Sequence, residues 1–285
     1  MRDDFAVFIL SHGRPNKQVT LRTLKRRGYT GKWYIICDNE DKTIDQYYAL
    51  YGKEHIYVFD KEEAARRTDT MDTLTMRNSV VFARNMCHDI AKELGLTYFW
   101  ELEDDYEDFR SRVWDGEKCA TIYCTDLDSV IDAFIEFLDT SGALTVAFAQ
   151  TGDLLGGSYI MDESKRVLRK AMNSFFCRTD NPFKFFGRMN DDVNTYVSLG
   201  SRGSLFLTVR DMSLDQQDTQ RSKSGNSDMY KQLGTYCKSF YSVICNPSCI
   251  QVSGLEATNH TRIHHRIQWD NAVPKIISDK FKKSS

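Results

Sequence analysis

The sequence predicts an α/β protein with a mixed, mostly parallel central sheet flanked by helices. Short apolar runs alternate with amphipathic segments through the first half of the 285 residues, and this order is typical of parallel strands joined by helices. Several amphipathic segments stop at a glycine, as at Gly28, Gly52 and Gly95, where helices commonly end. Together these observations predict a sheet covered by helices.

The first half is expected to repeat one strand-and-helix unit. The run FAVFIL predicts a short buried strand, and KQVTLRTLKRRG places Val19, Leu21 and Leu24 near one helical face. Apolar side chains between residues 76 and 94 keep the 3.6-residue period of a longer helix. The other elements expected in this half are strands at 32–38, 55–60 and 96–102 and a helix at 41–52.

The second half has a weaker pattern. The elements expected there are a helix at 129–138, a strand at 143–150, a turn at 154–157, strands at 173–178 and 205–210, a helix around 228–241 and a basic tail from residue 259. We expect a soft boundary near residues 140–150, with both halves belonging to a single composite domain over residues 1–285.

Composition excludes some classes of protein. Lys plus Arg (38) against Asp plus Glu (40) gives a net charge of −2, so any site for a polyanion must be local. The apolar runs are too short to span a bilayer, and the N-terminus has no signal-peptide pattern. The eight cysteines include no CxxC pair, which favours reduced thiols. We therefore expect an intracellular protein without a membrane partner.

A cluster of acids ends the fourth expected strand. In TYFWELEDDYEDF, the apolar run leads into Glu103, Asp104 and Asp105, and adjacent carboxylates repel unless a positive group lies between them. Three interpretations are open: the DDxxD diphosphate motif of terpene synthases, a solvated acidic loop, and a site for a divalent cation with nucleotide-sugar phosphates. The strand context argues against the first, which belongs on a helix.

Other polar residues follow the carboxyl ends of neighbouring strands. Ser11 and Arg14 come after the first strand, and Asp38 ends the second. Ligands of open α/β sheets bind outside the carboxyl ends of the strands. We therefore expect these residues to share one edge of the sheet with the acid cluster, which favours the third interpretation.

A helix carrying Ala83-Arg84-Asn85 precedes the acid-ended strand. This arrangement resembles the GT-A glycosyltransferases, in which an ARN helix precedes a strand that ends in DDD. The resemblance implies that Glu103 and Asp104 lie near the ribose and metal, and that Asp105 is the principal ligand of Mn²⁺ or Mg²⁺. The first acid here is Glu rather than the commoner Asp.

The same resemblance implies roles at the nucleotide. Asp38 matches a position that often holds the base or ribose, and Ser11 and Arg14 match the first nucleotide-contacting loop. Arg84 can offset the diphosphate charge. The nucleotide-sugar-binding half is then about 1–145, and the acceptor and catalytic half about 146–285.

An acidic pair follows the aromatic run in FKFFGRMNDDVNTY. Asp191 and Asp192 resemble the acidic pair that inverting GT-A enzymes use to take the proton from an acceptor hydroxyl. Asn190 or Asp191 is also a good helix N-cap, and a cap and a base can coexist. Of the two acids, Asp192 is preferred as the base.

The tail RIHHRIQW carries His264 and His265. Several GT-A families return a C-terminal histidine to the metal, and this resemblance implies that one of the pair completes the coordination. Adjacent residues of an extended chain point in opposite directions, so at most one is expected to bind. A surface or core position is the alternative.

A narrower resemblance covers nearly the whole chain. MNSFFCRTDNPFKFFGRMNDDVNTYVSLGSRG, GTYCKSFYSV and RIHHRIQWDNAVPKII are similar to the bacteriophage glycosyltransferases associated with ten-eleven-translocation-type dioxygenases. This resemblance implies transfer of a hexose or pentose from a nucleotide sugar, with a UDP-sugar expected, to a hydroxymethylated pyrimidine such as 5-hydroxymethylcytosine in DNA. Such DNA hypermodification would occur in the cytoplasm of the infected bacterial host.

Three rival interpretations stay open. A GT-A transferase acting on a protein or glycan shares every donor-site feature and differs in its acceptor. A sugar nucleotidyltransferase would use similar carboxylates but release diphosphate. A catalytically inactive binding module predicts that loss of Asp105 leaves function intact. The sequence does not determine the sugar, the stereochemistry or the oligomeric state.

Overall fold

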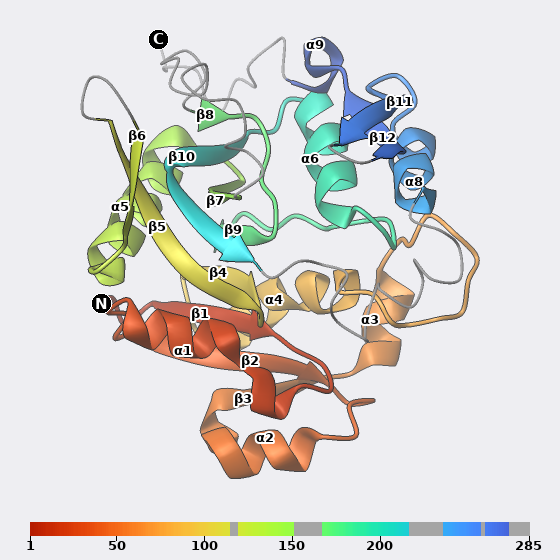
Figure 1. Ribbon diagram of the computed structural model, residues 1–285. Coiled ribbons are helices and arrows are strands. Elements are labelled where there is room, and N and C mark those ends of the chain that lie inside the picture. The colour runs from red at the N-terminus through yellow and green to blue at the C-terminus, as the bar shows by residue number, and fades with distance from the viewer. Residues whose placement is uncertain (115–118, 151–166, 217–235, 258–259, 274–285) are drawn as a thin grey trace, which may run out of the picture.

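A ten-stranded sheet with helices on both faces forms the body of the protein (Figure 1). The computed structural model describes residues 1–114, 119–150, 167–216, 236–257 and 260–273. Within those residues, no helix is long and apolar enough to cross a membrane.

The strands of the main sheet are β1 (Phe5–Leu10), β2 (Lys32–Asp38), β3 (Ile56–Phe59), β4 (Tyr98–Glu103), β5 (Tyr106–Trp114), β6 (Cys119–Tyr123), β7 (Thr145–Gln150), β8 (Val167–Leu168), β9 (Ser174–Arg178) and β10 (Phe206–Gln216). They lie in the order β3-β2-β1-β4-β9-β7-β10-β5-β6, and β8 pairs with β10. Parallel pairing joins β3, β2, β1 and β4, whereas β9 runs antiparallel to β4 and β7. The predicted mixed sheet flanked by helices is confirmed.

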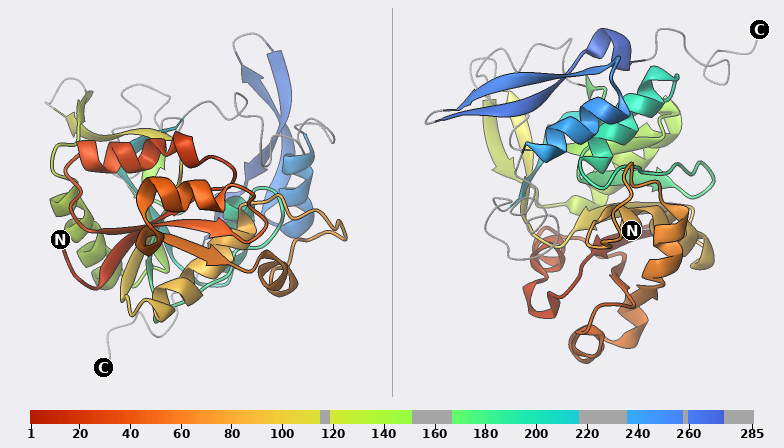
Figure 2. Two further views of the ribbon diagram at one scale, coloured as in Figure 1. Left: turned by 90° about the horizontal axis from the view of Figure 1, so that it is seen from below. Right: turned by 90° about the vertical axis from the view of Figure 1, so that its right-hand side faces the viewer.

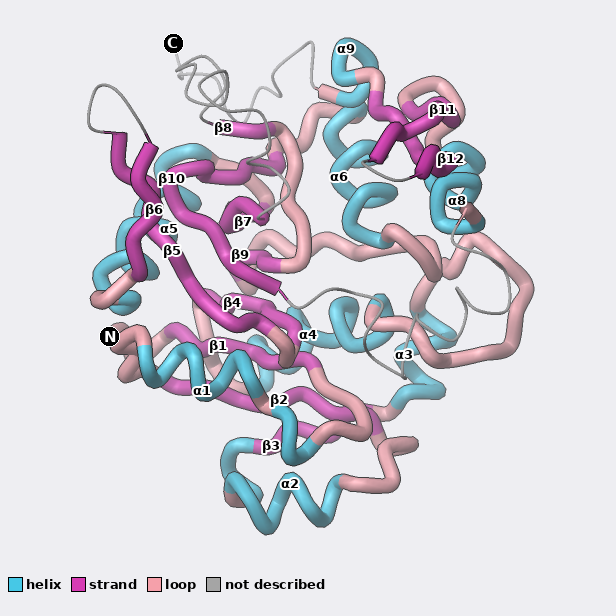
Figure 3. Tube along the Cα trace, viewed as in Figure 1, coloured by secondary structure: helices cyan, strands magenta, loops and turns pink. Residues whose placement is uncertain are grey.

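The helices are α1 (Val19–Arg26), α2 (Ile44–Tyr51), α3 (Lys61–Arg67), α4 (Val81–Glu93), α5 (Leu127–Ser141), α6 (Asp191–Ser201), α8 (Cys237–Cys245) and α9 (Trp269–Ala272), with 3-10 turns at Pro15–Lys17 and Lys53–His55. Side chains alternate across the sheet, so β1 contributes to two cores. Its odd-numbered residues from Phe5 to Ile9 pack with α1, α2 and α5, and its even-numbered residues pack with α3, α4 and α6. Figure 3 shows these helices on the two sides of the strands.

The C-terminal part adds a separate hairpin. β11 (Ile250–Ala257) and β12 (His260–Ile267) form a two-stranded antiparallel sheet that stands apart from the main sheet in Figure 2. Helix α8 lies against both strands. Residues 260–267 of the predicted basic tail form β12, and residues 274–285 lie outside the described residues. The hairpin was not predicted, and neither were β5, β6, β8 and α3.

The strand expected at 205–210 extends as β10 to Gln216, and the start of one predicted helix is wrong. The helix expected from residue 76 begins at Val81, because Arg188 holds the preceding segment in another conformation. Its guanidinium bonds to the carbonyl oxygens of Leu74 and Met76, and Ser79 Oγ donates to the Arg188 carbonyl at 2.7 Å. Of the helix expected at 228–241, the described part begins at Cys237, and residues 228–235 and the turn at 154–157 lie outside the described residues.

Strands from the two proposed halves interleave in one sheet. β9 and β10 of the second half, together with β7, lie between β4 and β5 of the first. The carboxyl ends of β1, β2 and β4 meet at one edge, with Leu10 opposite both Ile36 and Glu103. The division near residue 145 stays a prediction.

Candidate active site

The acid cluster occupies the turn at the carboxyl end of β4, and Asp104 is its buried member. Asp104 accepts a hydrogen bond from Ser11 Oγ at 2.6 Å and pairs with Arg14 Nη1 at 3.1 Å. Burial raises the pKa of Asp104 to about 6, although Arg14 and Ser11 oppose that rise. Arg14 is therefore the positive group beside this acid.

Hydrogen bonds of Ser11 fix the loop after β1. Besides its bond to Asp104, the Ser11 hydroxyl bonds to the Tyr47 hydroxyl at 2.8 Å and accepts a hydrogen bond from Gln18 Nε2 at 2.8 Å. The backbone nitrogen of Val19 donates to the Asp104 carbonyl at 2.9 Å. The expected meeting of this loop with the acid cluster at one sheet edge is thus present in the structure.

Asp38 lies at the same edge but is already engaged by two side chains. His12 Nδ1 lies 2.7 Å from Oδ2, and Lys61 Nζ lies 3.2 Å from Oδ1. Burial alone would raise the pKa of Asp38, but His12 and Lys61 outweigh it and the pKa is lowered. The His12 side chain is 50% exposed against 7% for Asp38, so His12 is the more accessible group for a nucleotide.

Arg84 is the positive group beside Glu103. Its guanidinium, 2% exposed, pairs with Asp191 Oδ2 at 2.7 Å, Glu103 Oε1 at 2.9 Å and Glu101 Oε1 at 3.2 Å. Burial lowers the pKa of Arg84, but the acids around it overcome that effect and raise the pKa above its ordinary value. Arg84 therefore stays charged. The contact with a diphosphate that the sequence suggested for Arg84 is not tested by these distances.

The acidic pair begins α6. Asp191 bonds to Arg84, whereas Asp192 Oδ1 accepts from the backbone nitrogen of Val193 at 2.8 Å. Both are buried, and burial, followed by the charge of Asp191, raises the pKa of Asp192 to about 6. A carboxyl group with such a pKa can act as a base near neutral pH.

Asn190 stands at the N-cap position of α6, but its side chain does not cap the helix. Its backbone is left-handed, with φ 51°, and its Nδ2 donates to the Lys238 carbonyl and to Ser242 Oγ, both at 3.0 Å. The capping interpretation is therefore wrong for Asn190. Instead, Asn190 fixes the start of α6 to α8.

The hairpin brings the histidine pair to the start of α6. His265 Nδ1 lies 3.4 Å from Asn190 Nδ2, and the rings of His264 and His265 are 4.3 Å apart between centroids. Burial lowers the pKa of His265 to about 4, which keeps this ring neutral. Among the described residues, no group of three or more His, Cys, Asp or Glu side chains could hold a metal ion.

Asp105 suits a divalent cation better than its two neighbours. Glu103 lies 2.9 Å from Arg84 and Asp104 lies 3.1 Å from Arg14, whereas the contact described for Asp105 is a hydrogen bond of 3.3 Å from the neutral Gln216 Nε2. Its pKa is raised by burial and by Asp104. A partly exposed carboxylate with a weak partner fits a hard cation whose other ligands are phosphate oxygens.

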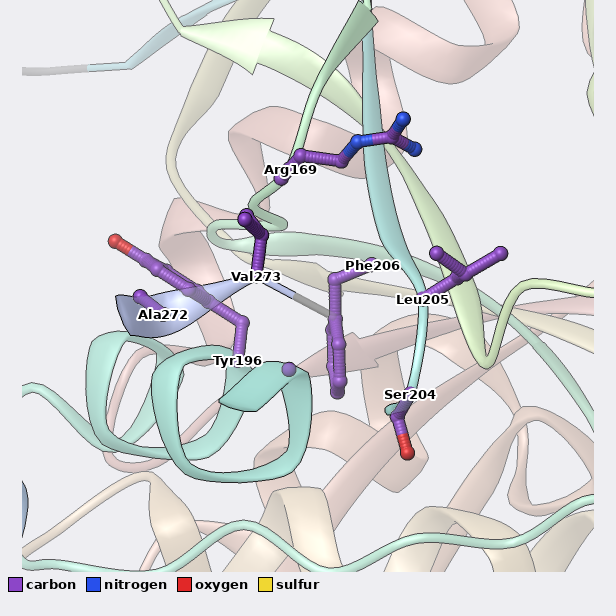
Figure 4. A pocket seen from close by; sticks show the side chains of 8 residues that line it. Arg169, Tyr196, Ser204, Leu205, Phe206, Ala272 and Val273 are labelled. Atoms are coloured by element: carbon purple, nitrogen blue, oxygen red, sulfur yellow. The ribbon is translucent and has the colours of Figure 1, made fainter. Parts of the chain in front are cut away.

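A small hollow lies away from these residues (Figure 4). Tyr196 and Gly200 of α6, Phe206 of β10 and Ala272 of α9 line it. None of the predicted site residues borders this hollow, so it is separate from the candidate active site.

Four residues that contact the predicted site residues were not predicted from the sequence. They are Glu101, His12, Lys61 and Gln216. Glu101 had a detectable signal, because residues two apart in a strand share a face and Glu101 therefore lies on the same side of β4 as Glu103. Gln216 Nε2 donates to Glu103 Oε2 at 2.8 Å, but it arrives from β10, far along the chain. No local pattern marks such a contact.

A mixed sheet whose β4 ends in clustered carboxylates, beside a fixed loop after β1, is the arrangement of a glycosyltransferase that takes its sugar from a nucleotide donor, and this is the class of the protein. The family model described as TET-Associated Glycosyltransferase matches residues 5–225. The chain belongs to this family. No curated protein sequence matches the chain.

Several solved structures resemble the fold. Glucosyl-3-phosphoglycerate synthase from Mycobacterium tuberculosis, in complex with Mn²⁺, UDP and phosphoglyceric acid, is 11% identical over 92% of this chain and 86% of that one, with a TM-score of 0.47. A mannosyltransferase from Pyrobaculum calidifontis, in complex with GDP-mannose and Mn²⁺, is 9% identical over 86% and 74%, also with a TM-score of 0.47. A putative nucleotide-diphospho-sugar transferase from Desulfovibrio desulfuricans is 8% identical over 81% and 95%, with a TM-score of 0.40. These identities are too low to transfer residue roles.

Proposed function

We propose that the protein transfers a sugar from a UDP-linked donor to the hydroxyl of a 5-hydroxymethylpyrimidine, specifically 5-hydroxymethylcytosine, in bacteriophage DNA. The observation that carries the catalytic part is a shared contact: the Arg84 guanidinium contacts both Glu103 at the end of β4 and Asp191 at the start of α6. The acceptor is inferred from membership of the TET-Associated Glycosyltransferase family. The reaction would take place in the cytoplasm of the infected host.

The donor side of the site follows from the sheet edge. Ser11, Arg14 and Asp38 would line the nucleotide, and Glu103 and Asp104 would lie near the ribose. Asp105, with either His264 or His265, would hold Mn²⁺ or Mg²⁺. When bound, the metal ion would neutralise charge on the diphosphate leaving group.

Asp192 is the better candidate for the base. Asp191 has one carboxylate oxygen bound to Arg84 at 2.7 Å, whereas Asp192 has a pKa near neutrality. In an inverting reaction, Asp192 takes the hydroxyl proton of the acceptor as its oxygen bonds to the anomeric carbon. The bond from that carbon to the donor phosphate oxygen breaks, and UDP leaves.

The acceptor can be tested by mass spectrometry of nucleosides from DNA containing 5-hydroxymethylcytosine, after incubation with the protein, Mn²⁺ and a mixture of UDP-sugars. The proposal predicts a metal-dependent mass gain equal to one sugar, absent with unmodified cytosine DNA. Release of UDP without any mass gain would retain the donor assignment and overturn the acceptor. Release of diphosphate would instead indicate a nucleotidyltransferase.

A protein or glycan acceptor is the second candidate. The net charge of −2 provides no general attraction to a polyanion, and this observation favours an acceptor that is not a polyanion. DNA-stimulated UDP release separates the two candidates, because only a DNA-modifying enzyme is expected to respond to hydroxymethylated DNA.

A further inference from the structure

Arg84 connects three elements that the sequence keeps far apart. It projects from α4, and its guanidinium reaches Glu101 and Glu103 on β4 and Asp191 on α6 within 3.2 Å. Two nitrogens make directed bonds, Nη1 to Asp191 at 2.7 Å and Nη2 to Glu103 at 2.9 Å. The guanidinium plane thus fixes the separation and orientation of two acids that belong to different parts of the site.

The surroundings hold this guanidinium in one place. The Phe175 and Phe185 rings lie 5.1 and 5.5 Å from its central carbon, close enough for cation–π attraction. Glu101, 2% exposed, lies 3.2 Å from Nε without hydrogen-bond geometry. Arg84 is therefore enclosed by protein on several sides, with 2% of its side chain exposed.

The contacts continue from Arg84 to the proposed metal ligand. Glu103 uses one oxygen for Arg84 and the other for Gln216 Nε2 at 2.8 Å, and the same Nε2 lies 3.3 Å from Asp105 Oδ1. Both oxygens of Glu103 are thereby occupied by protein donors. A chain of polar contacts thus runs from Asp105 through Gln216, Glu103 and Arg84 to Asp191, the residue before Asp192.

We propose that Arg84 is a positioning residue that sets the acidic pair of α6 relative to the β4 acid cluster, and that it does not bind the donor diphosphate. The inference rests on the proposed function of this site as a glycosyltransferase centre. This role differs from the one expected from the sequence, in which Arg84 offsets the negative charge of the donor diphosphate. A buried guanidinium already shared by three carboxylates has no exposed face for a phosphate.

The test is the variant Arg84→Lys, which keeps the positive charge but cannot bridge several carboxylates at once. We expect kcat, measured as UDP release, to fall on the order of 100-fold, the loss that follows a small misplacement of catalytic groups. The Kd for UDP with Mn²⁺, measured by calorimetry without acceptor, should stay within about twofold because binding does not use the misplaced group. The acidic limb of the pH–rate profile should shift little, because the variant keeps the positive charge that lowers the pKa of Asp192.

Arg27→Lys is the matched control. Arg27 also makes a two-pronged pair, with Asp108 at 2.6 and 2.7 Å, but it lies outside the proposed machinery. Its substitution should leave both kcat and the Kd for UDP unchanged. A tenfold weaker Kd for UDP in Arg84→Lys, with kcat retained, would assign Arg84 to the diphosphate and overturn the proposal.

Glu101→Gln provides a second route should Arg84→Lys fail to fold. Glu101 is buried and pairs with Arg84, and it contacts none of the proposed ligands, so we expect its effect on rate to pass mainly through the guanidinium. We expect a fall in kcat of roughly fivefold with the Kd for UDP unchanged, and an unchanged kcat would refute the positioning role. The two measurements, the kcat of UDP release and the Kd for UDP, do not need DNA. If the wild-type protein releases UDP but leaves DNA unmodified, the proposed DNA acceptor is wrong and the proposal for Arg84 is still tested.

Discussion

Two arginines resolve the electrostatic problem of three adjacent acids. Arg14 lies beside Asp104, and Arg84 lies beside Glu103, which leaves Asp105 as the acid most suited to a cation. The sequence located the acids and both arginines. It did not reveal which arginine pairs with which acid, because Asp191 is 107 positions from Arg84 and only the fold brings them together.

At the base, the pH dependence of the reaction should follow Asp192. A base works in its ionised form, and burial raises the pKa of Asp192 to about 6. We therefore expect kcat/KM to rise with pH up to about 6 and to level off above it, as long as no other group titrates there.

The measurement is kcat/KM against pH for the wild type and for Asp192→Asn. The variant should lose the rise near pH 6 and about 10²- to 10⁴-fold of its rate. Full turnover in both Asp192→Asn and Asp191→Asn would show that neither is the base.

At the metal, Asp105→Asn should weaken Mn²⁺ binding in the presence of UDP. Loss of a carboxylate charge from a hard-cation site lowers the affinity for the cation. We expect the Kd for Mn²⁺ to rise at least tenfold. Electron paramagnetic resonance, which reports free Mn²⁺, measures this Kd. Glu107→Gln removes an exposed acid two residues away and should have no effect. Equal Mn²⁺ affinity in both variants would remove Asp105 from the metal site.

At the scale of elements, periodicity was informative where one face is apolar and the other polar. Helices α1 and α2 were predicted for this reason, close to their observed limits, whereas β1 was predicted from a short apolar run that is buried throughout. β5 was missed because YEDFRSRVW carries charged side chains at four of its nine positions, which interrupts the apolar pattern of a strand. The start of α4 was misplaced because a distant side chain, Arg188, holds the preceding segment.

The turn before α6 provides an element-scale prediction. Gly187 has φ +85°, and a Cβ there would lie 2.2 Å from Asn194 Nδ2, a buried amide that donates to the Met189 carbonyl. Gly187→Ala should therefore lower the free energy of unfolding by roughly 2–4 kcal/mol, the sum of backbone strain and a clash. Gly95→Ala, with φ +67° and nothing within 4 Å, should lose only about 1 kcal/mol in the same denaturant titration.

For the whole molecule, the site is assembled from residues spread between positions 11 and 265. Insertion of β9, β7 and β10 between β4 and β5 brings Gln216 to the acid cluster, and α8 anchors Asn190 at the start of α6. No sequence pattern predicts such an insertion, since strand order depends on long-range packing. The matched family region ends at residue 225, before α8 and the hairpin begin.

The first residue of the hairpin nevertheless packs in the protein core. Ile250 is 1% exposed and packs in the core on the α4 and α6 side of the sheet, whereas Ile244 of α8 is 68% exposed. Ile250→Ala should lower the free energy of unfolding by about 2–4 kcal/mol, and Ile244→Ala by no more than about 0.5 kcal/mol. A thermal or chemical unfolding curve gives both values, and equal small losses would show that this region contributes little to folding.

The locked loop after β1 has a thermodynamic consequence for the donor. Ser11 is held by Tyr47, Gln18 and Asp104 before any nucleotide arrives, so the conformational entropy of this backbone, about 1–2 kcal/mol per residue, is already lost when the chain folds. A nucleotide that binds here does not have to order the loop. The association rate of the nucleotide donor should therefore be set by diffusional encounter rather than by a change of loop conformation.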